Sequence, residues 1–142
     1  MLYPGKVLSA MDDKQLVVQR WIKKASRDLY TARTMLQADD VPTDIVCFHC
    51  QQCAEKSFQA FLVSVDQDPP RTHDVVKLLA LCRNFGDDFS SLEGNAISLA
   101  DYAVEVRYPD DWREIPREEA SDALLKATEV LTFVRRELRD SD

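Results

Sequence analysis

The chain has 142 residues, 45% of them hydrophobic, and a formal net charge of −7 at neutral pH. This length and apolar content predict one compact domain over residues 1–142, with a core of about residues 12–139 and short flexible tails. A globally acidic protein repels the phosphate backbone, which argues against RNA as a partner but leaves room for a small anion site. No apolar run approaches the roughly 20 residues that cross a bilayer, and residues 1–10 do not resemble a secretory signal, so we expect a cytoplasmic protein without a membrane partner.

Four cysteines are present, and three of them, Cys47, Cys50 and Cys53, are spaced by three residues around His49. This spacing suggests a metal site, because thiolate and imidazole are the ligands that zinc prefers. On a helix, however, positions i, i+3 and i+6 spread over about 120° around the axis and about 9 Å along it, and they cannot converge on one tetrahedral ion. We therefore expect no metal and no other cofactor, and we interpret the cysteines, Cys82 included, as reduced, small core residues.

Helices are favoured throughout, since the chain has only three glycines and no run of alternating β-branched residues. The first predicted helix spans about Asp13–Gln37, with Asp12 or Asp13 as its N-cap. It ends before Pro42, because a residue that precedes proline is disfavoured in the helical region.

The second predicted helix begins near Thr43, a natural N-cap, and stops before Asp68. The third opens at Thr72 or His73 and ends near Gly86.

The fourth predicted helix spans roughly Ser91–Val106, and the fifth starts just after Pro116 and runs to about Arg139. Together the segments predict an all-α protein, an antiparallel up-and-down bundle of four to five helices. The apolar positions at helical spacing are the predicted core: Val18, Trp21, Ala25, Leu29, Ala32, Leu36, Cys47, Cys50, Ala54, Phe58, Phe61, Leu62, Val75, Val76, Leu78, Leu79, Cys82, Leu92, Ala96, Leu99, Ala100, Ala103, Ala120, Leu124, Ala127, Leu131, Val134 and Leu138.

Polar residues on these apolar faces are the candidates for a site. Asp28 lies on the inner face of the first helix, and Gln51 and Glu55 lie on the inner face of the second. A carboxylate in such a position is costly unless it is paired or hydrogen-bonded, and the guanidinium of Arg107 is an available partner. The arrangement predicts either a structural ion pair or a polar pocket in which Arg107, helped by Lys56, binds a phosphate.

His73 lies at a helix start, where it either caps or stacks on a neighbour, or acts as a proton donor, since histidine exchanges its proton near neutral pH. Tyr102, Tyr108 and Trp112 bracket Arg107 and either form a stacking surface or fill a helix or dimer interface. The sequence contains no Gly-rich phosphate loop, no His-Glu-x-x-His pair and no Gly-x-Ser-x-Gly turn.

The chain contains, in this order, residues 24–29, the run CFHCQQCAEKSFQAFL, the run RTHDVVKLL and the run YAVEVRYPD, followed by an alanine-rich closing helix. Together these segments resemble the HEPN domain family (higher eukaryotes and prokaryotes nucleotide-binding), bacterial stand-alone type. The resemblance covers about Val18 to Leu138. It implies a small all-α bundle that usually pairs into a homodimer. Many bacterial members are similar to partners of minimal nucleotidyltransferases, in two-gene modules of the toxin–antitoxin kind.

Active ribonucleases of this family carry an arginine followed, after four to six residues, by a histidine. Counted from Arg107, that histidine would stand at residues 112–114, which are Trp, Arg and Glu. Neither His49 nor His73 follows an arginine at the required distance. The ribonuclease motif is therefore absent, which favours a protein without catalytic residues.

The resemblance carries over Arg107 from that motif and matches four positions of the first two helices. With the two neighbouring candidates, the predicted ligand- and anion-binding set is Arg107, Asp28, Gln52, Glu55, Lys56, His73 and Tyr108. The leading interpretation is a non-enzymatic, homodimeric HEPN protein that binds a nucleotide-like phosphate ligand, a minimal nucleotidyltransferase partner, or both. The alternatives are a HEPN ribonuclease toxin with a displaced constellation, in which His73 is the acid or base and Arg107 stabilises the phosphorane, and a purely structural interaction module.

Overall fold

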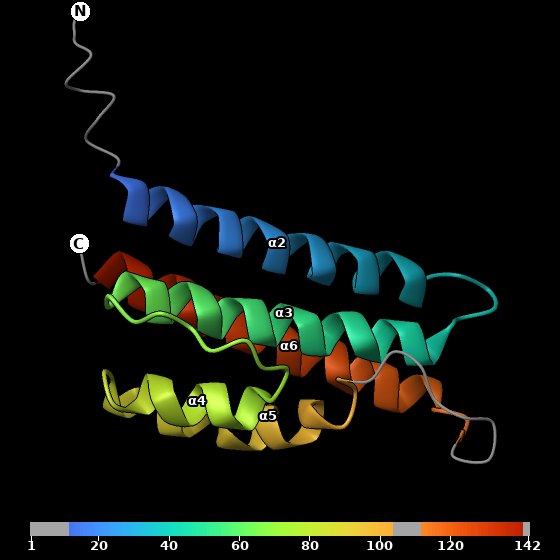
Figure 1. The fold of residues 1–142 in the computed structure, drawn as a ribbon. Helices are drawn as coiled ribbons and strands as arrows, with labels where there is room; N and C mark the ends of the chain where they lie inside the picture. The colour runs from blue at the N-terminus through green and yellow to red at the C-terminus, as the bar shows by residue number, and fades with distance from the viewer. Residues whose placement is uncertain (1–11, 104–111, 141–142) are drawn as a thin grey trace, which may run out of the picture.

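All regular elements are helical in the computed structural model, which describes residues 12–103 and 112–140 (Figure 1). The all-α class predicted from the sequence is confirmed. The elements, labelled as in Figure 1, are α2 (Asp13–Leu36), α3 (Thr43–Ser64), α4 (Val75–Arg83), the 3-10 helix η1 (Asp87–Leu92), α5 (Glu93–Ala100) and α6 (Arg117–Asp140).

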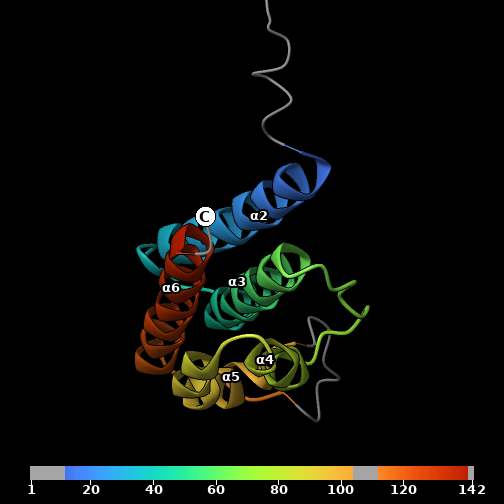
Figure 2. The same ribbon diagram turned by 90° about the vertical axis from the view of Figure 1, so that its left-hand side faces the viewer.

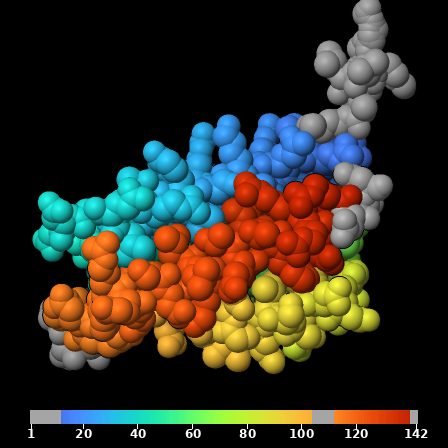
Figure 3. Space-filling view, turned by 180° about the vertical axis from the view of Figure 1, so that it is seen from behind, coloured from blue at the N-terminus to red at the C-terminus, as the bar shows by residue number. Residues whose placement is uncertain are grey.

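Helix α3 lies at the centre of the bundle. Figure 2 shows α2 above it, α6 on one side and α4 with α5 below, and no helix of residues 12–103 and 112–140 covers the remaining side of α3. From behind, α6 fills the space between α2 and the α4–α5 layer (Figure 3). The central helix is therefore covered by other helices on three sides.

The connection between α3 and α4 breaks the simple up-and-down alternation. After α3 ends, the chain runs back along it, so that the carbonyl of His73 accepts a hydrogen bond from Gln51 in the middle of α3. Helix α4 then runs in the same direction as α3 (Figure 1), and the Cys82 thiol reaches the Phe58 carbonyl. This return brings the α4 N-terminus beside the polar part of α3.

The core is built from small residues between the long helices and aromatic rings at one end. Cysteine and alanine side chains of α3 and α6 are fully buried, which lets these helices approach closely. At the aromatic end, the ring of Phe89 in η1 is tilted against that of Phe61 and meets that of Phe133 edge to face, with ring centroids 4.4 and 4.9 Å apart. Of the predicted core residues, Val76 is an exception, because it points outward and is 37% exposed.

Helix starts were harder to predict than helix existence. Asp12 caps α2 as predicted, with its carboxylate accepting from the Gln15 N–H in a reciprocal capping box. The prediction that Thr43 caps α3 is wrong, because Pro42 occupies the N-cap position and Thr43 is the first helical residue. Helix α4 begins at Val75, later than predicted.

The α4 cap is Asp74, whose carboxylate accepts from the N–H groups of Val76 and Lys77. Thr72, a predicted start, instead lies before the helix, where its hydroxyl oxygen accepts a hydrogen bond from the Asp74 N–H. His73 is not helical either.

The fourth predicted helix, Ser91–Val106, is divided and shorter in the structure. Its start belongs to η1, which begins at Asp87, and α5 ends at Ala100, so the prediction of one helix is wrong. Residues 104–106 lie outside the described ranges. Helix α2 stops one residue before its predicted end, and α3 ends at Ser64. None of the helices described here combines the length and apolar character needed to cross a membrane.

Candidate functional site

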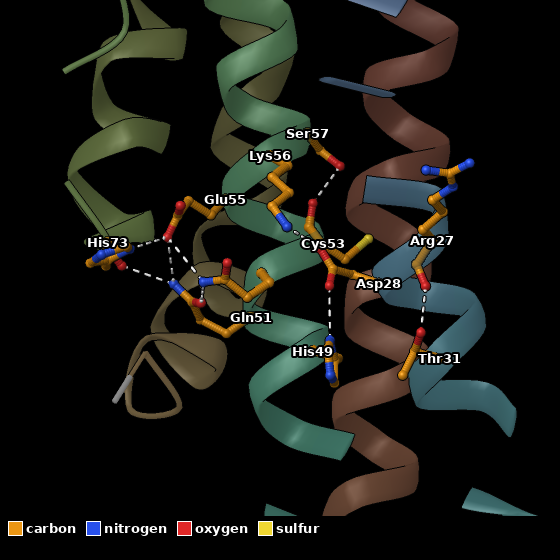
Figure 4. A network of polar contacts seen from close by, with 11 residues as sticks. Arg27, Asp28, Thr31, His49, Gln51, Cys53, Glu55, Lys56, Ser57 and His73 are labelled. Atoms are coloured by element: carbon orange, nitrogen blue, oxygen red, sulfur yellow. Dashed lines mark hydrogen bonds and ion pairs between the residues drawn. The ribbon is translucent and has the colours of Figure 1, made fainter. Parts of the chain in front are cut away.

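Asp28 forms the centre of the first polar cluster, which we call the Asp28 cluster. Its Oδ1 lies 2.8 Å from Nδ1 of His49 and its Oδ2 lies 2.6 Å from Nζ of Lys56 (Figure 4). The two partners stand two turns apart on the side of α3 that faces α2, so one carboxylate reaches both. The side chains of Asp28, His49 and Lys56 are 11%, 27% and 22% exposed, respectively, so the cluster is half-buried rather than solvated.

Glu55 forms the centre of a second cluster, the Glu55 cluster, between α3 and the start of α4. Its Oε1 accepts from Nε2 of Gln51 at 3.3 Å, from Nε2 of Gln52 at 3.4 Å and from Nδ1 of His73 at 3.0 Å. Gln51 also donates to the His73 carbonyl at 2.9 Å, which ties the chain before α4 to α3. Glu55 is buried, whereas the His73 side chain is 74% exposed.

The two clusters lie on different sides of α3 and do not form one pocket. In Figure 4, His49 points toward α2 while His73 lies on the α4 side, with the helix between them. Lys56 of the Asp28 cluster and Gln52 of the Glu55 cluster stand one turn apart on α3, so the two clusters are neighbours along this helix.

Each histidine is held in the same chemical manner. An ionised carboxylate only accepts hydrogen bonds, so Nδ1 of each ring donates and Nε2 is the nitrogen available to another group. Lys56 has three N–H donors, and its contact with Asp28 uses one. The clusters can therefore orient imidazole nitrogens and an ammonium group toward a ligand.

A third polar contact joins the residue Tyr102, which precedes residues 104–111, to Arg113 and Glu119, which follow them. Glu119, in the first turn of α6, accepts from the Tyr102 hydroxyl and from both terminal nitrogens of Arg113, at 3.0 and 2.6 Å. These donors hold the pKa of Glu119 below its usual value, chiefly through Arg113. Burial and the Glu119 hydrogen bond raise the pKa of Tyr102, so the phenol stays protonated.

The cysteines lie in the core. Burial raises the pKa of Cys47 to about 11 and those of Cys53 and Cys82 to about 12, and it raises that of Cys50 as well. Neutral thiols are poor metal ligands. Within the described residues, no group of three or more His, Cys, Asp or Glu side chains could hold a metal ion.

The structure brings the predicted site residues together in two groups rather than one. Asp28 and Lys56 meet in the Asp28 cluster, and Gln52, Glu55 and His73 meet in the Glu55 cluster. The other two predicted residues, Arg107 and Tyr108, lie outside the described residues.

His49 was not in the predicted set, because its place among the cysteines suggested only a zinc ligand. The signal that could have found it is its spacing from Lys56, which places both on the face of α3 that meets Asp28.

A separate open groove of about 360 Å³ lies between η1, α5 and α6. It contains none of the predicted site residues. Its lining is mixed, with Thr128, Thr132, Asn95 and Arg136 beside Leu92 and Phe133.

Comparison with known proteins places the fold and the clusters in a family context. The family model of the HEPN domain matches residues 18–137 of this chain, a range that includes both clusters. A curated protein of Methanocaldococcus jannaschii, "Putative toxin MJ1304", is 25% identical over 84% of this chain and 87% of its own length.

Two solved structures are also similar. TT1696 from Thermus thermophilus is 28% identical with a TM-score of 0.70, over 84% of this chain and 96% of its own. ST0689, described as an archaeal HEPN homologue, is 27% identical with a TM-score of 0.68, over 85% and 97%. Because the family match extends over nearly the whole described bundle and the solved relatives share its helices, the chain belongs to the HEPN domain family.

Proposed function

We propose that this chain is a non-enzymatic, homodimeric HEPN protein of a toxin–antitoxin-like module. It binds a nucleotide-like phosphate group, a minimal nucleotidyltransferase partner, or both. The similarity to a protein named as a toxin supports the module, and the polar clusters of α3 support the ligand.

The observation that carries the ligand proposal is the charge balance of the Asp28 cluster. One carboxylate faces an ammonium group and an imidazole, so cationic and donor groups outnumber the carboxylate. Lys56 and His49 are half-buried, so solvent and salt weaken their attraction to an anion less than they would for fully exposed side chains. Arg107 supplies the second cation in this proposal.

A calorimetric titration of the purified protein with ATP and with inorganic phosphate tests the ligand. Replacing Lys56→Gln or Arg107→Ala removes a charge-assisted contact, so we expect affinity to fall by about 10- to 100-fold. The matched control is Lys126→Gln, since Lys126 also has a carboxylate partner at 2.6 Å but lies on α6, away from both clusters. Unchanged affinity in folded Lys56→Gln and Arg107→Ala proteins would refute the anion site.

Co-expression with the nucleotidyltransferase encoded by an adjacent gene tests the partner. A complex that co-elutes in size-exclusion chromatography and is lost in a charge-reversed α3 variant is the expected result. Two separate peaks at concentrations near 100 times a typical micromolar Kd would contradict it. Retention of the complex in a folded Arg107→Ala variant would favour the purely structural module.

One observation favours an enzyme as the second candidate. His73 is exposed, and its ring is oriented through Nδ1 by the buried carboxylate of Glu55, an arrangement that suits a general acid or base. A ribonuclease assay with a single-stranded RNA substrate decides this. Cleavage that is lost in His73→Ala, and kept in a control at an exposed position such as Asp87→Ala, would replace the binding proposal by this one.

A further inference from the structure

Helix α2 carries a charge opposite to that of the rest of the chain. It contains six basic and two acidic residues, a net charge of +4 in a protein whose total is −7, so the other residues together carry −11. Four of the six basic residues are Arg20, Lys23, Lys24 and Arg27. They lie within about 100° of one another around the helix and within about 11 Å along it. We call these four residues the basic face of α2.

The basic face points into solvent. All four side chains are exposed, and the residues that α2 buries in the core, Ala25, Leu29 and Ala32, stand on the opposite side of the helix. Among the residues that the structure describes, none of the four cations forms an ion pair. The packing of the described helices therefore makes no use of these charges.

The spacing of the four charges works against the helix that carries them. Arg20 precedes Lys23 and Lys24 by three and four residues, and Arg27 follows them by four and three. Side chains at these spacings are neighbours on a helix surface, and like charges there are destabilising. Replacing one of them by glutamate would turn repulsion into attraction. The basic face thus lowers the stability of the isolated helix, which indicates that it serves a contact outside it.

Further residues at the edge of the basic face favour a protein as that contact. Arg135 of α6 donates a hydrogen bond to Oγ of Ser26, which brings a fifth cation beside Arg27. Tyr30, three residues after Arg27, is 67% exposed. Arginine and tyrosine are both enriched in protein–protein interfaces and among the residues that dominate their binding energy.

Carboxylates limit the length of the contact. Asp13 stands two turns before Arg20 on the same side of α2, and Asp39 and Asp40 follow the end of the helix; all three are exposed. A long polyanion such as a nucleic acid, or a flat anionic membrane, would extend past the basic face and meet these carboxylates. An acidic segment of about two to three helical turns would avoid them.

We propose that the basic face of α2 is a docking surface for a short acidic helix of a partner protein. The carboxylates of that helix stand at the same i, i+3, i+4 and i+7 spacing, so each can meet one cation when the two helices lie side by side. The surface is separate from the Asp28 and Glu55 clusters. The inference goes beyond the proposed function, and the failure of either leaves the other standing.

Binding of a synthetic peptide to the full-length protein, followed by fluorescence anisotropy, tests the match. The probe is a labelled alanine-based helix with four glutamates on one stripe at the i, i+3, i+4 and i+7 positions. Its reference is a peptide of the same composition with the glutamates spread around the helix. The stripe peptide should bind at least about fivefold more tightly, because only the stripe meets all four cations at once. Equal affinities would overturn the proposed docking.

A double variant locates the contact on α2. Lys23→Gln with Arg27→Gln removes two exposed charge pairs, and the affinity for the stripe peptide should fall about five- to tenfold. The matched control is Arg71→Gln with Lys77→Gln, which removes the same net charge from exposed residues beside α4, on the other side of α3 (Figure 2). The control should change the affinity by less than about twofold. Equal losses would show that net charge alone governs binding and would overturn the docking surface.

Thermal unfolding separates lost docking from lost folding. The α2 double variant removes most of the like-charge neighbours, so its melting temperature should equal or exceed that of the wild type. A clear decrease would show that these cations stabilise the bundle itself, and the argument from repulsion would fail.

Two other polyanions decide whether the partner is a protein. An oligouridine of about 12 nucleotides and vesicles that contain phosphatidylserine replace the peptide at the same salt concentration. Each should bind at least about tenfold more weakly than the stripe peptide, because both extend past the basic face onto acidic surface. Binding of either that is as tight as that of the stripe peptide would overturn the assignment to an acidic helix.

Discussion

Replacement of Asp28 by asparagine is the sharpest probe of the candidate site. The amide keeps the size of the side chain and one acceptor oxygen but removes the charge that balances Lys56. The Lys56 ammonium is then left half-buried without a counter-ion, with only 22% of its side chain exposed. We therefore expect Asp28→Asn to destabilise the protein.

The magnitude follows from burial. Breaking a fully buried pair costs about 3–5 kcal/mol, whereas exposed pairs contribute about 0.2–1 kcal/mol. With side chains 11% and 22% exposed, the Asp28–Lys56 pair lies between these limits and nearer the buried one. We expect a loss of roughly 2–3 kcal/mol in the free energy of unfolding at pH 7, measured by urea denaturation.

Helix α6 provides a matched control. Lys126 and Asp122 also approach to 2.6 Å, but the Asp122 side chain is 53% exposed. Asp122→Asn should therefore change stability by less than about 0.5 kcal/mol. Equal effects of the two substitutions, or an Asp28→Asn effect below about 0.5 kcal/mol, would refute the argument that burial sets the value of the pair.

A second variant separates the charge from the contact. Lys56→Met combined with Asp28→Asn removes both charges and keeps an apolar stem of similar length. Buried ion pairs are often replaced by apolar groups without loss, so the double variant should be more stable than Asp28→Asn alone. A double variant as unstable as the sum of the two single variants would contradict an interaction between these residues.

Three further outcomes follow from other parts of the structure. Hydrogen-bond donors lower the pKa of Glu119 in the folded state. The stabilisation that Glu119 provides should therefore be complete above pH 4.5, its ordinary pKa, and should be lost as the pH falls through the lower pKa of the folded state. Glu119→Gln should accordingly flatten the acid side of a plot of melting temperature against pH. The four thiols have raised pKa values, so unfolding should become easier above their ordinary value of 9.0, and iodoacetamide at pH 8 should label them only after denaturation. The side-chain oxygen Oε1 of Gln59 is buried without a hydrogen-bond partner within the described residues. Gln59→Met removes this polar atom and should raise the free energy of unfolding, measured by urea denaturation, by about 1 kcal/mol.

Helical periodicity was sufficient to predict the elements but not their ends. Thr72, His73 and Asp74 are three consecutive residues that can each cap a helix, and the sequence alone does not rank them. Tertiary contacts decide between them, because the His73 carbonyl and ring are both held by α3. Asp74 is the next residue, and its exposed carboxylate accepts from the first N–H groups of α4. The division of the fourth predicted helix has no such signal in the sequence, since its apolar spacing fits both a 3-10 turn and an α-helix.

The site was predictable as a set of residues but not as a pattern of contacts. The inner position of Asp28 indicated that it needs a partner, and Lys56 was among the candidates. A helical pattern predicts the face of the helix on which a residue lies, but it does not predict how that helix is rotated against its neighbour. The contact between His49 and Asp28 depends on the packing of α2 on α3 and could not be read from the pattern. Arg107, which the sequence suggested as the partner of Asp28, lies outside the described residues, so that pairing stays a prediction.

The arrangement of the two histidines bears on the choice between binding and catalysis. The chain has only His49 and His73, so any imidazole chemistry must use one or both of them. Acid–base cleavage of RNA by two histidines requires both rings on one phosphate, and here α3 separates them (Figure 4). A single-histidine reaction would then depend on His73 alone, whereas an anion or a partner protein needs only the orientation and charge that the Asp28 cluster provides, and the binding proposal is accordingly the more economical one.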